Sequence, residues 1–211
     1  MTLSVRAVIP VYRLGFGALV LIAILIQMIS LGQAGLLDPL HYLTYFTNLS
    51  NMIAAVVFIL GATGFRFVRS PAFHVVRGGA VVYMTITGVV FAVLLSGVNV
   101  DAQLRWVNDL IHQVFPIVVL ADWLLDAPQT RLTVRQSALW LSFPFAWVAY
   151  ELIRGAISGK YHYPFLNPAN GGYGSVVLYV AMIAVFAVVV CGVILWLSTA
   201  RRPNEATRQA S

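Results

Sequence analysis

Polar residues able to carry out chemistry fall inside two apolar segments of this chain. His112 lies in the segment 106–125, and Thr47 lies in the segment 42–65. A threonine hydroxyl is a weak nucleophile until a base removes its proton, and a neutral imidazole is well suited to that role near pH 7. A threonine of the segment 42–65, Thr44 or Thr47, and His112 are therefore a candidate nucleophile and base.

The segment around His112 carries a polar stripe. Six residues share one face at about 100° per residue: Arg105, Asn108, Asp109, His112, Pro116 and Val119. Asp109 precedes His112 by about one turn, so we expect its carboxylate to orient the imidazole as the third member of a triad. Ionisable groups in a spanning helix cost about 2.5–3.5 kcal/mol each, which favours a functional role.

A second polar face opens the segment that holds Thr47. Thr44, Thr47, Asn48 and Asn51 recur at spacings of three and four, so we expect them on one side of a helix. The amides of Asn48, Asn51 and Asn108 are candidates for donating hydrogen bonds to an oxyanion. The alternative is structural, because threonine in a membrane helix often only bonds the carbonyl one turn back or joins two helices.

A third polar face lies near the end of the segment 137–157. Glu151 and Arg154 are three residues apart and can pair, which lowers the cost of both charges. We expect a structural ion pair here, with contact to a substrate as the alternative. The following loop, 160–168, is rich in aromatic residues and proline and includes Tyr163, another candidate for substrate contact. Its composition suits the headgroup boundary, where it would cap a cavity shared by the three polar faces.

The composition indicates that lipid surrounds these segments. Of 211 residues, 60% are hydrophobic and only 9% are charged, whereas a soluble domain carries roughly a quarter charged residues. A spanning helix needs about 20 apolar residues, and strands with open edges are excluded from lipid. We therefore expect an all-α integral membrane protein, a bundle of about six transmembrane helices forming one membrane-embedded domain over 1–211. The expected helices are 14–31, 42–65, 79–98, 106–125, 137–157 and 176–197.

The basic residues indicate the orientation of this bundle. Ten of the 13 Arg and Lys residues fall on one side: Arg6, Arg13, Arg66, Arg69, Arg77, Arg131, Arg135, Arg201, Arg202 and Arg208. The other side carries Arg105, Arg154 and Lys160, beside Asp38 and Asp101. Because basic residues gather in cytoplasmic loops, we expect both termini in the cytoplasm and the protein in the plasma membrane. Asp122 and Asp126 lie near the inner end, where we expect them to meet water or Arg131.

Several partners are excluded or unsupported. The net charge of +6 comes from basic residues scattered beside apolar segments, so it predicts membrane topology and no nucleic acid. The single cysteine, Cys191, rules out an intramolecular disulfide or a cysteine metal site. A haem protein usually pairs histidine ligands at membrane depth, and His112 stands alone there. We expect no metal and no cofactor.

Three short motifs resemble the androgen-induced family of multi-span membrane proteins. They are the aromatic and threonine-containing stretch from Tyr42 to Asn51, the stretch from Asn108 to His112 followed by Pro116, and the sequence Tyr-Pro-Phe-Leu at 163–166. Mammalian members of that family hydrolyse fatty acid esters of hydroxy fatty acids with an intramembrane threonine and histidine. The resemblance therefore implies a hydrolase that acts on a membrane lipid or lipid-like ester.

The resemblance also implies residue roles. His112 matches the family histidine, and either Thr44 or Thr47 matches the threonine. The stretch Tyr45-Phe46-Thr47 favours Thr47, as in prokaryotic relatives. Asp109 departs from the mammalian pattern, which can carry a second histidine at that position.

A protein without enzymatic activity is the main alternative. A transporter, a lipid binder or a helical scaffold would share this composition. Transporters often show two similar halves with broken helices. Pro116 and Pro144 fall within expected helices, but the sequence shows no half-repeat.

Overall fold

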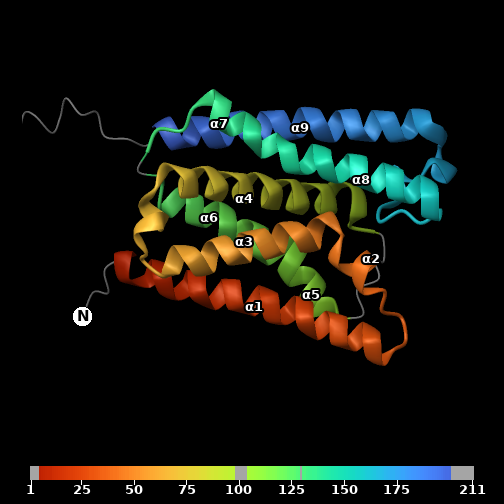
Figure 1. Ribbon diagram of the computed structural model, residues 1–211, viewed down its shortest axis with the longest axis horizontal. Helices are drawn as coiled ribbons and strands as arrows, with labels where there is room; N and C mark the ends of the chain where they lie inside the picture. The colour runs from red at the N-terminus through yellow and green to blue at the C-terminus, as the bar shows by residue number, and fades with distance from the viewer. Residues whose placement is uncertain (1–4, 98–103, 129, 201–211) are drawn as a thin grey trace, which may run out of the picture.

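Helices dominate this protein, and the computed structural model describes residues 5–97, 104–128 and 130–200, in which no strand occurs (Figure 1). The long segments are α1 (Val5–Gln33), α3 (Phe46–Ala62), α4 (Pro71–Val90) with the π-helical turn η2 (Phe91–Leu95), α5 (Arg105–Asp109) with η3 (Leu110–Val114) and α6 (Phe115–Leu125), α7 (Val134–Ala138) with η4 (Leu139–Leu141) and α8 (Ser142–Ser158), and α9 (Gly172–Ala200). The short ones are α2 (Pro39–Leu43), η1 (Arg66–Arg69), η5 (Pro164–Leu166) and η6 (Pro168–Asn170).

The long segments run back and forth along one axis. The first turn of α1 and the last turn of α9 lie at the same end of the bundle, here called the terminal end, and α2 lies at the opposite end, here called the α2 end (Figure 1). This arrangement agrees with both termini facing one side. Asp101, Arg201, Arg202 and Arg208, which entered the charge argument, lie outside the described residues.

Four helices are long and apolar enough to cross a membrane: Val8–Gln33, Pro71–Leu95, Arg105–Leu125 and Gly172–Thr199. The apolar helix α3 has 17 residues and reaches about 25 Å, short of the ~30 Å core of a bilayer. The segment from α7 to α8 contains Arg135, Glu151 and Arg154. The all-helical, membrane-compatible class is confirmed, and the count of six spans stays a prediction.

The expected helix 42–65 is wrong at its beginning. Asp38 caps α2 by accepting a hydrogen bond from the backbone N–H of His41 at 3.0 Å, as N-terminal aspartates commonly do. Helix α2 then ends at Leu43, and Tyr45 has an extended backbone (φ −55°, ψ 135°) before α3 begins at Phe46. Thr44 therefore lies in the turn between two helices, and it does not share a helical face with Thr47.

The expected helix 79–98 begins earlier than predicted, and its last residue lies outside the described residues. Ser70 caps α4 and Pro71 occupies its first position, a combination that favours a helix start. Arg77 is consequently buried inside α4, and Arg13 is buried inside α1. Neither arginine lies in a loop, although the assignment of basic residues to the two sides of the membrane had placed both outside the helices.

These two arginines form an ionic cluster with Asp122 and Asp126, here called the Arg–Asp cluster. Asp122 contacts Arg13 Nε and Arg77 Nη2 at 2.7 Å each, and Tyr12 also donates to it. Asp126 lies 2.7 Å from Arg13 Nη2. The prediction that Asp122 meets water or Arg131 is therefore wrong. Buried charges need partners, and two guanidinium groups balance two carboxylates across α1, α4 and α6.

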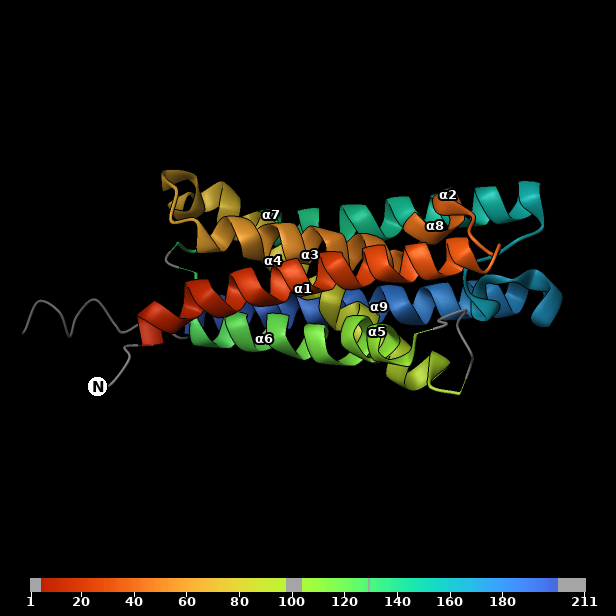
Figure 2. The same cartoon turned by 90° about the horizontal axis from the view of Figure 1, so that it is seen from below.

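The core consists of apolar side chains from all the long segments. Helix α1 packs along α3, while α4 contacts α3, α6 and α9. Gly17 allows the close approach of α1 to α3, because a β-carbon there would lie 2.9 Å from the carbonyl oxygen of Ala55. Figure 2 shows α2 and α8 on one side of the bundle and α5 and α6 on the other.

Candidate active site

A threonine, a histidine and a glutamate form a hydrogen-bonded chain at the α2 end. Thr44 Oγ1 lies 3.2 Å from Nε2 of His162. The other ring nitrogen of His162, Nδ1, contacts Oε2 of Glu151, and the backbone N–H of His162 donates to Oε1 at 2.5 Å. A hydroxyl, an imidazole and a carboxylate are thus connected in the order found in hydrolase triads.

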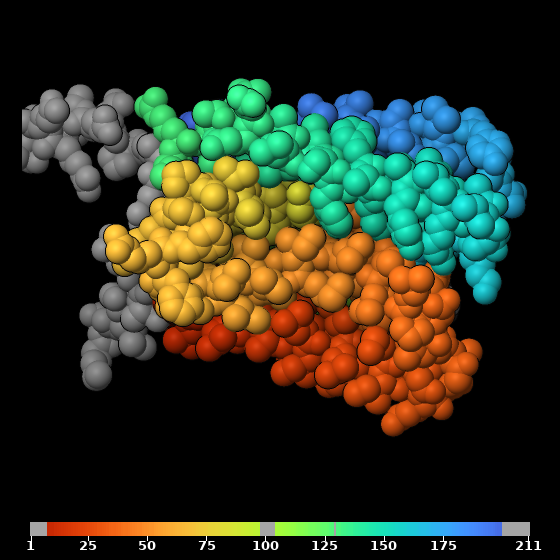
Figure 3. Space-filling view, viewed as in Figure 1, coloured from red at the N-terminus to blue at the C-terminus, as the bar shows by residue number. Residues whose placement is uncertain are grey.

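The chain reversal after α8 brings His162 back over Glu151. Helix α8 ends at Ser158 and is capped by Gly159, whose φ of +69° is readily adopted only by glycine. The returning segment packs tightly on α8, because a β-carbon at Gly155 would clash with the ring of Tyr161. Figure 3 shows α2 beside the segment that follows α8 at this end. Glu151 is fully buried and His162 is only 4% exposed.

Arg154 and His41 complete the surroundings of the imidazole. The Arg154 guanidinium donates to His41 Nδ1 at 2.5 Å and lies 3.3 Å from Nδ1 of His162. It also lies 3.7 Å from Glu151, so the expected ion pair forms, although His162 is the closer partner of the carboxylate. The ring of His41 stacks on that of His162 at 4.3 Å.

Burial, followed by the nearby His162 and Arg154, lowers the pKa of His41 below its ordinary value. A neutral His41 suits its position, because its Nδ1 then accepts the hydrogen bond from Arg154. A positive charge on His41 would be repelled by the adjacent guanidinium of Arg154. Helix α2 is therefore docked on the site by the hydrogen bond between Arg154 and His41.

The proton arrangement around His162 suits a base. A proton on Nδ1 is held by the Glu151 carboxylate, which leaves Nε2 facing Thr44 Oγ1. The carbonyl oxygen of His41 lies 3.0 Å from Nε2 of His162. It can accept a hydrogen bond from this nitrogen once Nε2 carries a proton. Thr44 Oγ1 also lies 2.6 Å from the carbonyl oxygen of Leu40, so its proton has a resting acceptor. The carboxylate of Glu151 is the group placed to orient the ring while Thr44 gives up its proton.

The predicted pair Thr47 and His112 is arranged differently. Thr47 Oγ1 lies 3.2 Å from the hydroxyl of Tyr163, and burial raises the pKa of that phenol to about 12. His112 Nδ1 lies 3.0 Å from the carbonyl oxygen of Asn108, and its ring stacks on Phe91. No hydrogen bond joins Thr47 to His112, although both belong to the described part of the chain. Their cooperation in catalysis stays a prediction.

The other candidates make mostly local bonds. Asp109 accepts a hydrogen bond from Gln113 at 3.3 Å and makes none to the ring of His112. Asn48 donates to the carbonyl of Tyr42 at 2.7 Å. Asn51 donates to the carbonyls of Thr47 and Ile111 at 2.8 and 3.0 Å, and so ties α3 to η3. The structure brings neither amide to the Thr44 hydroxyl.

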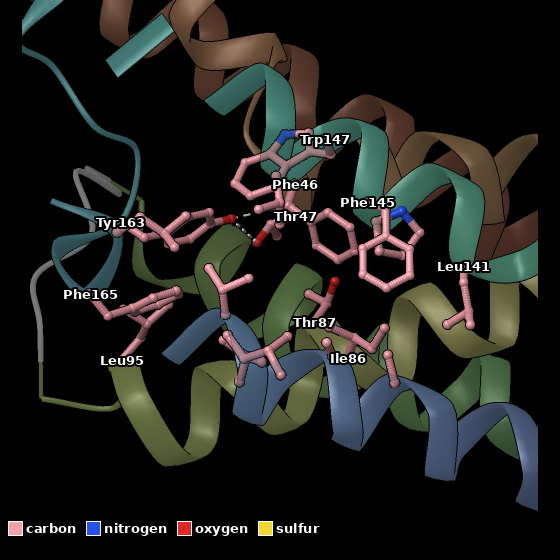
Figure 4. A pocket seen from close by; sticks show the side chains of 18 residues that line it. Phe46, Thr47, Ile86, Thr87, Leu95, Leu141, Phe145, Trp147, Tyr163 and Phe165 are labelled. Atoms are coloured by element: carbon pink, nitrogen blue, oxygen red, sulfur yellow. Dashed lines mark hydrogen bonds between the residues drawn. The ribbon is translucent and has the colours of Figure 1, made fainter. Parts of the chain in front are cut away.

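An apolar cavity of about 70 Å³ adjoins this site between α3, α4, α8 and α9 (Figure 4). Thr47 and Tyr163 meet at its edge, and Trp147 forms part of its wall. The indole N–H of Trp147 donates to the carbonyl of Thr44 at 2.8 Å. Trp147 and Tyr163 therefore belong to the cavity and, through Thr44 and the neighbouring His162, to the polar site.

Sequence reasoning missed His162 and His41. It favoured His112 because that histidine lies inside an apolar segment, where an ionisable group is costly. The signal for His162 was its place between two tyrosines in a loop that was expected to cap a cavity. Glu151 was recognised as paired with Arg154, but its closer partner, His162, lies 11 residues later.

Within the described ranges, no group of three His, Cys, Asp or Glu side chains is arranged to hold a metal ion. Comparisons of the chain with protein-family models, with curated proteins and with solved structures found no match. The geometry of the site is therefore the basis for a functional proposal.

Proposed function

We propose that this chain is a six-span plasma-membrane protein that hydrolyses a lipid ester, with Thr44 as nucleophile. His162 is the base, and Glu151 orients and stabilises its ring. The observation that carries the proposal is the chain of contacts from Thr44 Oγ1 through the two ring nitrogens of His162 to the buried carboxylate of Glu151. Thr47 with His112 is the alternative pair, and it rests on the family resemblance.

The reaction follows from this geometry. Thr44 Oγ1 attacks the ester carbonyl carbon while its proton passes to Nε2 of His162. The ring returns this proton to the departing alcohol oxygen, which leaves an acyl group on Thr44. A water molecule then gives a proton to Nε2 and attacks the acyl carbon, and the acid leaves as the threonine hydroxyl regains its proton. Glu151 stabilises the positive ring in both steps.

The site would face the outside of the cell. Thr44 and His162 lie at the α2 end, opposite the terminal end, where the positive-inside rule places the cytoplasm. With the termini in the cytoplasm, a lipid from the outer leaflet would reach the site. The apolar cavity next to Thr44 supports a substrate with a hydrocarbon part.

A fluorophosphonate probe tests the nucleophile. We expect covalent labelling of the purified protein at Thr44, lost in Thr44→Ala and in His162→Gln. Thr47→Ala and His112→Gln are the matched controls, because they remove the same groups from the alternative pair. We expect both controls to keep labelling within a few-fold.

Each outcome assigns the chemistry. Labelling lost only in the two control variants would overturn the Thr44 site in favour of Thr47 and His112. Absence of labelling in the wild-type protein, together with no ester hydrolysis in lipid vesicles, would overturn the hydrolase and favour a lipid binder or scaffold.

A further inference from the structure

The apolar cavity between α8 and α9 extends along the two helices. Its lining runs from Leu141 to Val148 on one side and from Val180 to Ala187 on the other. Seven residues of helix rise by about 10 Å. The cavity is therefore an elongated groove, and we call it the α8–α9 groove.

The two helices that border this groove are joined mainly at their ends. Helix α9 contacts α7 and η4 near the terminal end and η5 and η6 near the α2 end. Between these contacts, the groove separates α8 from α9. Phe145, which lines it, is 51% exposed. The groove therefore opens sideways, toward the surface that would face lipid.

The outer faces of the two helices are apolar. Val177, Val185 and Ile153 are among the most exposed hydrophobic residues of α8 and α9. Exposed apolar surface of this kind faces hydrocarbon in a membrane protein. A molecule that enters between α8 and α9 would thus pass from the bilayer into the groove without meeting water.

The groove also leads to the polar site. Trp147 lines it and binds the carbonyl of Thr44, while Tyr163 lines it and follows His162 directly. Thr87 points into it from α4 (Figure 4), is 3% exposed, and has no hydrogen-bond partner among the described residues. Apart from this hydroxyl and the Thr47–Tyr163 pair, the side chains that line the groove present apolar surface.

We infer that the α8–α9 groove binds one hydrocarbon chain of a membrane lipid, which enters laterally between α8 and α9 and places its polar end near Thr44. The groove is apolar and about 10 Å long, which suits part of a single alkyl chain better than a compact ring system. The inference names the substrate class of the proposed hydrolase and in that sense rests on it. Binding of the chain itself requires no catalysis.

Photolabelling in lipid vesicles tests the groove. The protein is reconstituted in phosphatidylcholine vesicles with a long-chain fatty acid that carries a diazirine near its methyl end, and labelled peptides are mapped by mass spectrometry. We expect labelling at Ile86 and Ile183 that excess oleate suppresses, because a site saturates. Labelling at the lipid-facing Val185 should persist in excess oleate.

Two substitutions of Thr87 distinguish the effect of filling the groove from the effect of losing the hydroxyl. Thr87→Trp fills the groove and should reduce the saturable labelling by about tenfold or more. Thr87→Val keeps the shape and removes only an unpartnered hydroxyl, so labelling should stay within about twofold. Ala184→Trp, at a half-buried position, obstructs the groove from α9 and should act like Thr87→Trp if that variant folds poorly.

Three results would overturn the inference: labelling that oleate does not suppress, labelling that survives both tryptophan variants, or its loss in Thr87→Val, which would indicate a polar ligand. Thr44→Ala separates the two proposals, because it abolishes hydrolysis and should leave the saturable labelling unchanged. Groove labelling without hydrolysis in the wild-type protein would refute the enzyme and retain the lipid site.

Discussion

Replacement of Glu151 by glutamine tests whether the carboxylate acts in catalysis as well as in folding. Glu151 is fully buried and has two contacts with His162, one to the ring and one to the backbone N–H. Glutamine keeps the size of the side chain and one carbonyl oxygen. The backbone contact can therefore survive, while the charge opposite the ring is lost.

The expected loss of stability follows from these contacts. Breaking a buried ion pair by removing one partner costs about 3–5 kcal/mol, and a hydrogen bond to a charged group contributes about 1.5–3 kcal/mol. Because the amide preserves one of the two bonds, we expect the free energy of unfolding to fall by about 3 kcal/mol, near the lower end of the first range. Arg154→Gln, the comparison variant, removes the partner of Glu151 at 3.7 Å together with the hydrogen bonds to His41 and to the Lys160 carbonyl, and should cost about 1.5–3 kcal/mol.

The expected loss of activity is larger than the loss of stability alone would produce. An amide in place of the orienting carboxylate leaves the wrong tautomer of the ring, and in the serine-protease triad this change lowers kcat about 10⁴-fold. We expect the rate of fluorophosphonate labelling per folded molecule to fall at least about 100-fold. Thermal unfolding in detergent, followed by circular dichroism, supplies the folded fraction.

The two readouts separate a structural glutamate from a catalytic one. A destabilised Glu151→Gln protein whose folded molecules react at the wild-type rate would confine Glu151 to a structural ion pair, as the sequence argument expected. A protein with unchanged stability and unchanged labelling would refute the contacts themselves.

Further predictions concern topology, the Arg–Asp cluster and pH. Cysteines placed at Arg69 and Lys160 should react with impermeant reagents from opposite faces of the membrane, and reaction from one face would refute the six-span topology. Asp122→Asn should destabilise the protein by about 3–5 kcal/mol in detergent melting, and Asp126→Asn by clearly less, because its side chain is 38% exposed; equal effects would contradict the central place of Asp122. Stability should fall as pH drops below about 6.5, since a lowered pKa for His41 means that the unfolded state binds more protons. His41→Asn should make this dependence less steep between pH 5 and pH 7, and an unchanged slope would contradict the contribution of His41.

Sequence alone was sufficient for the class of the protein and the approximate course of its helices. Long apolar segments with few charges leave helices as the one structure that satisfies the backbone in lipid. The end of α6 at Leu125 and the end of α8 at Ser158 lie within one residue of the limits expected from such local patterns. Hydrophobic length and periodicity are properties of neighbouring residues, so they can be taken from the chain without knowledge of its partners.

The tertiary structure decided which polar groups meet. Thr44 and His162 are separated by 118 residues and Arg13 and Asp122 by 109, and no periodicity connects positions so far apart. The break before α3 moved Thr44 off the face of Thr47, although both had the same spacing signal. His162 lies outside the long apolar segments, so nothing in the sequence marked its burial as costly, and it became a candidate only when the chain reversal after α8 placed it between Glu151 and Thr44. Helices form from local preferences, whereas a site forms where packing brings distant charges and hydroxyl groups together.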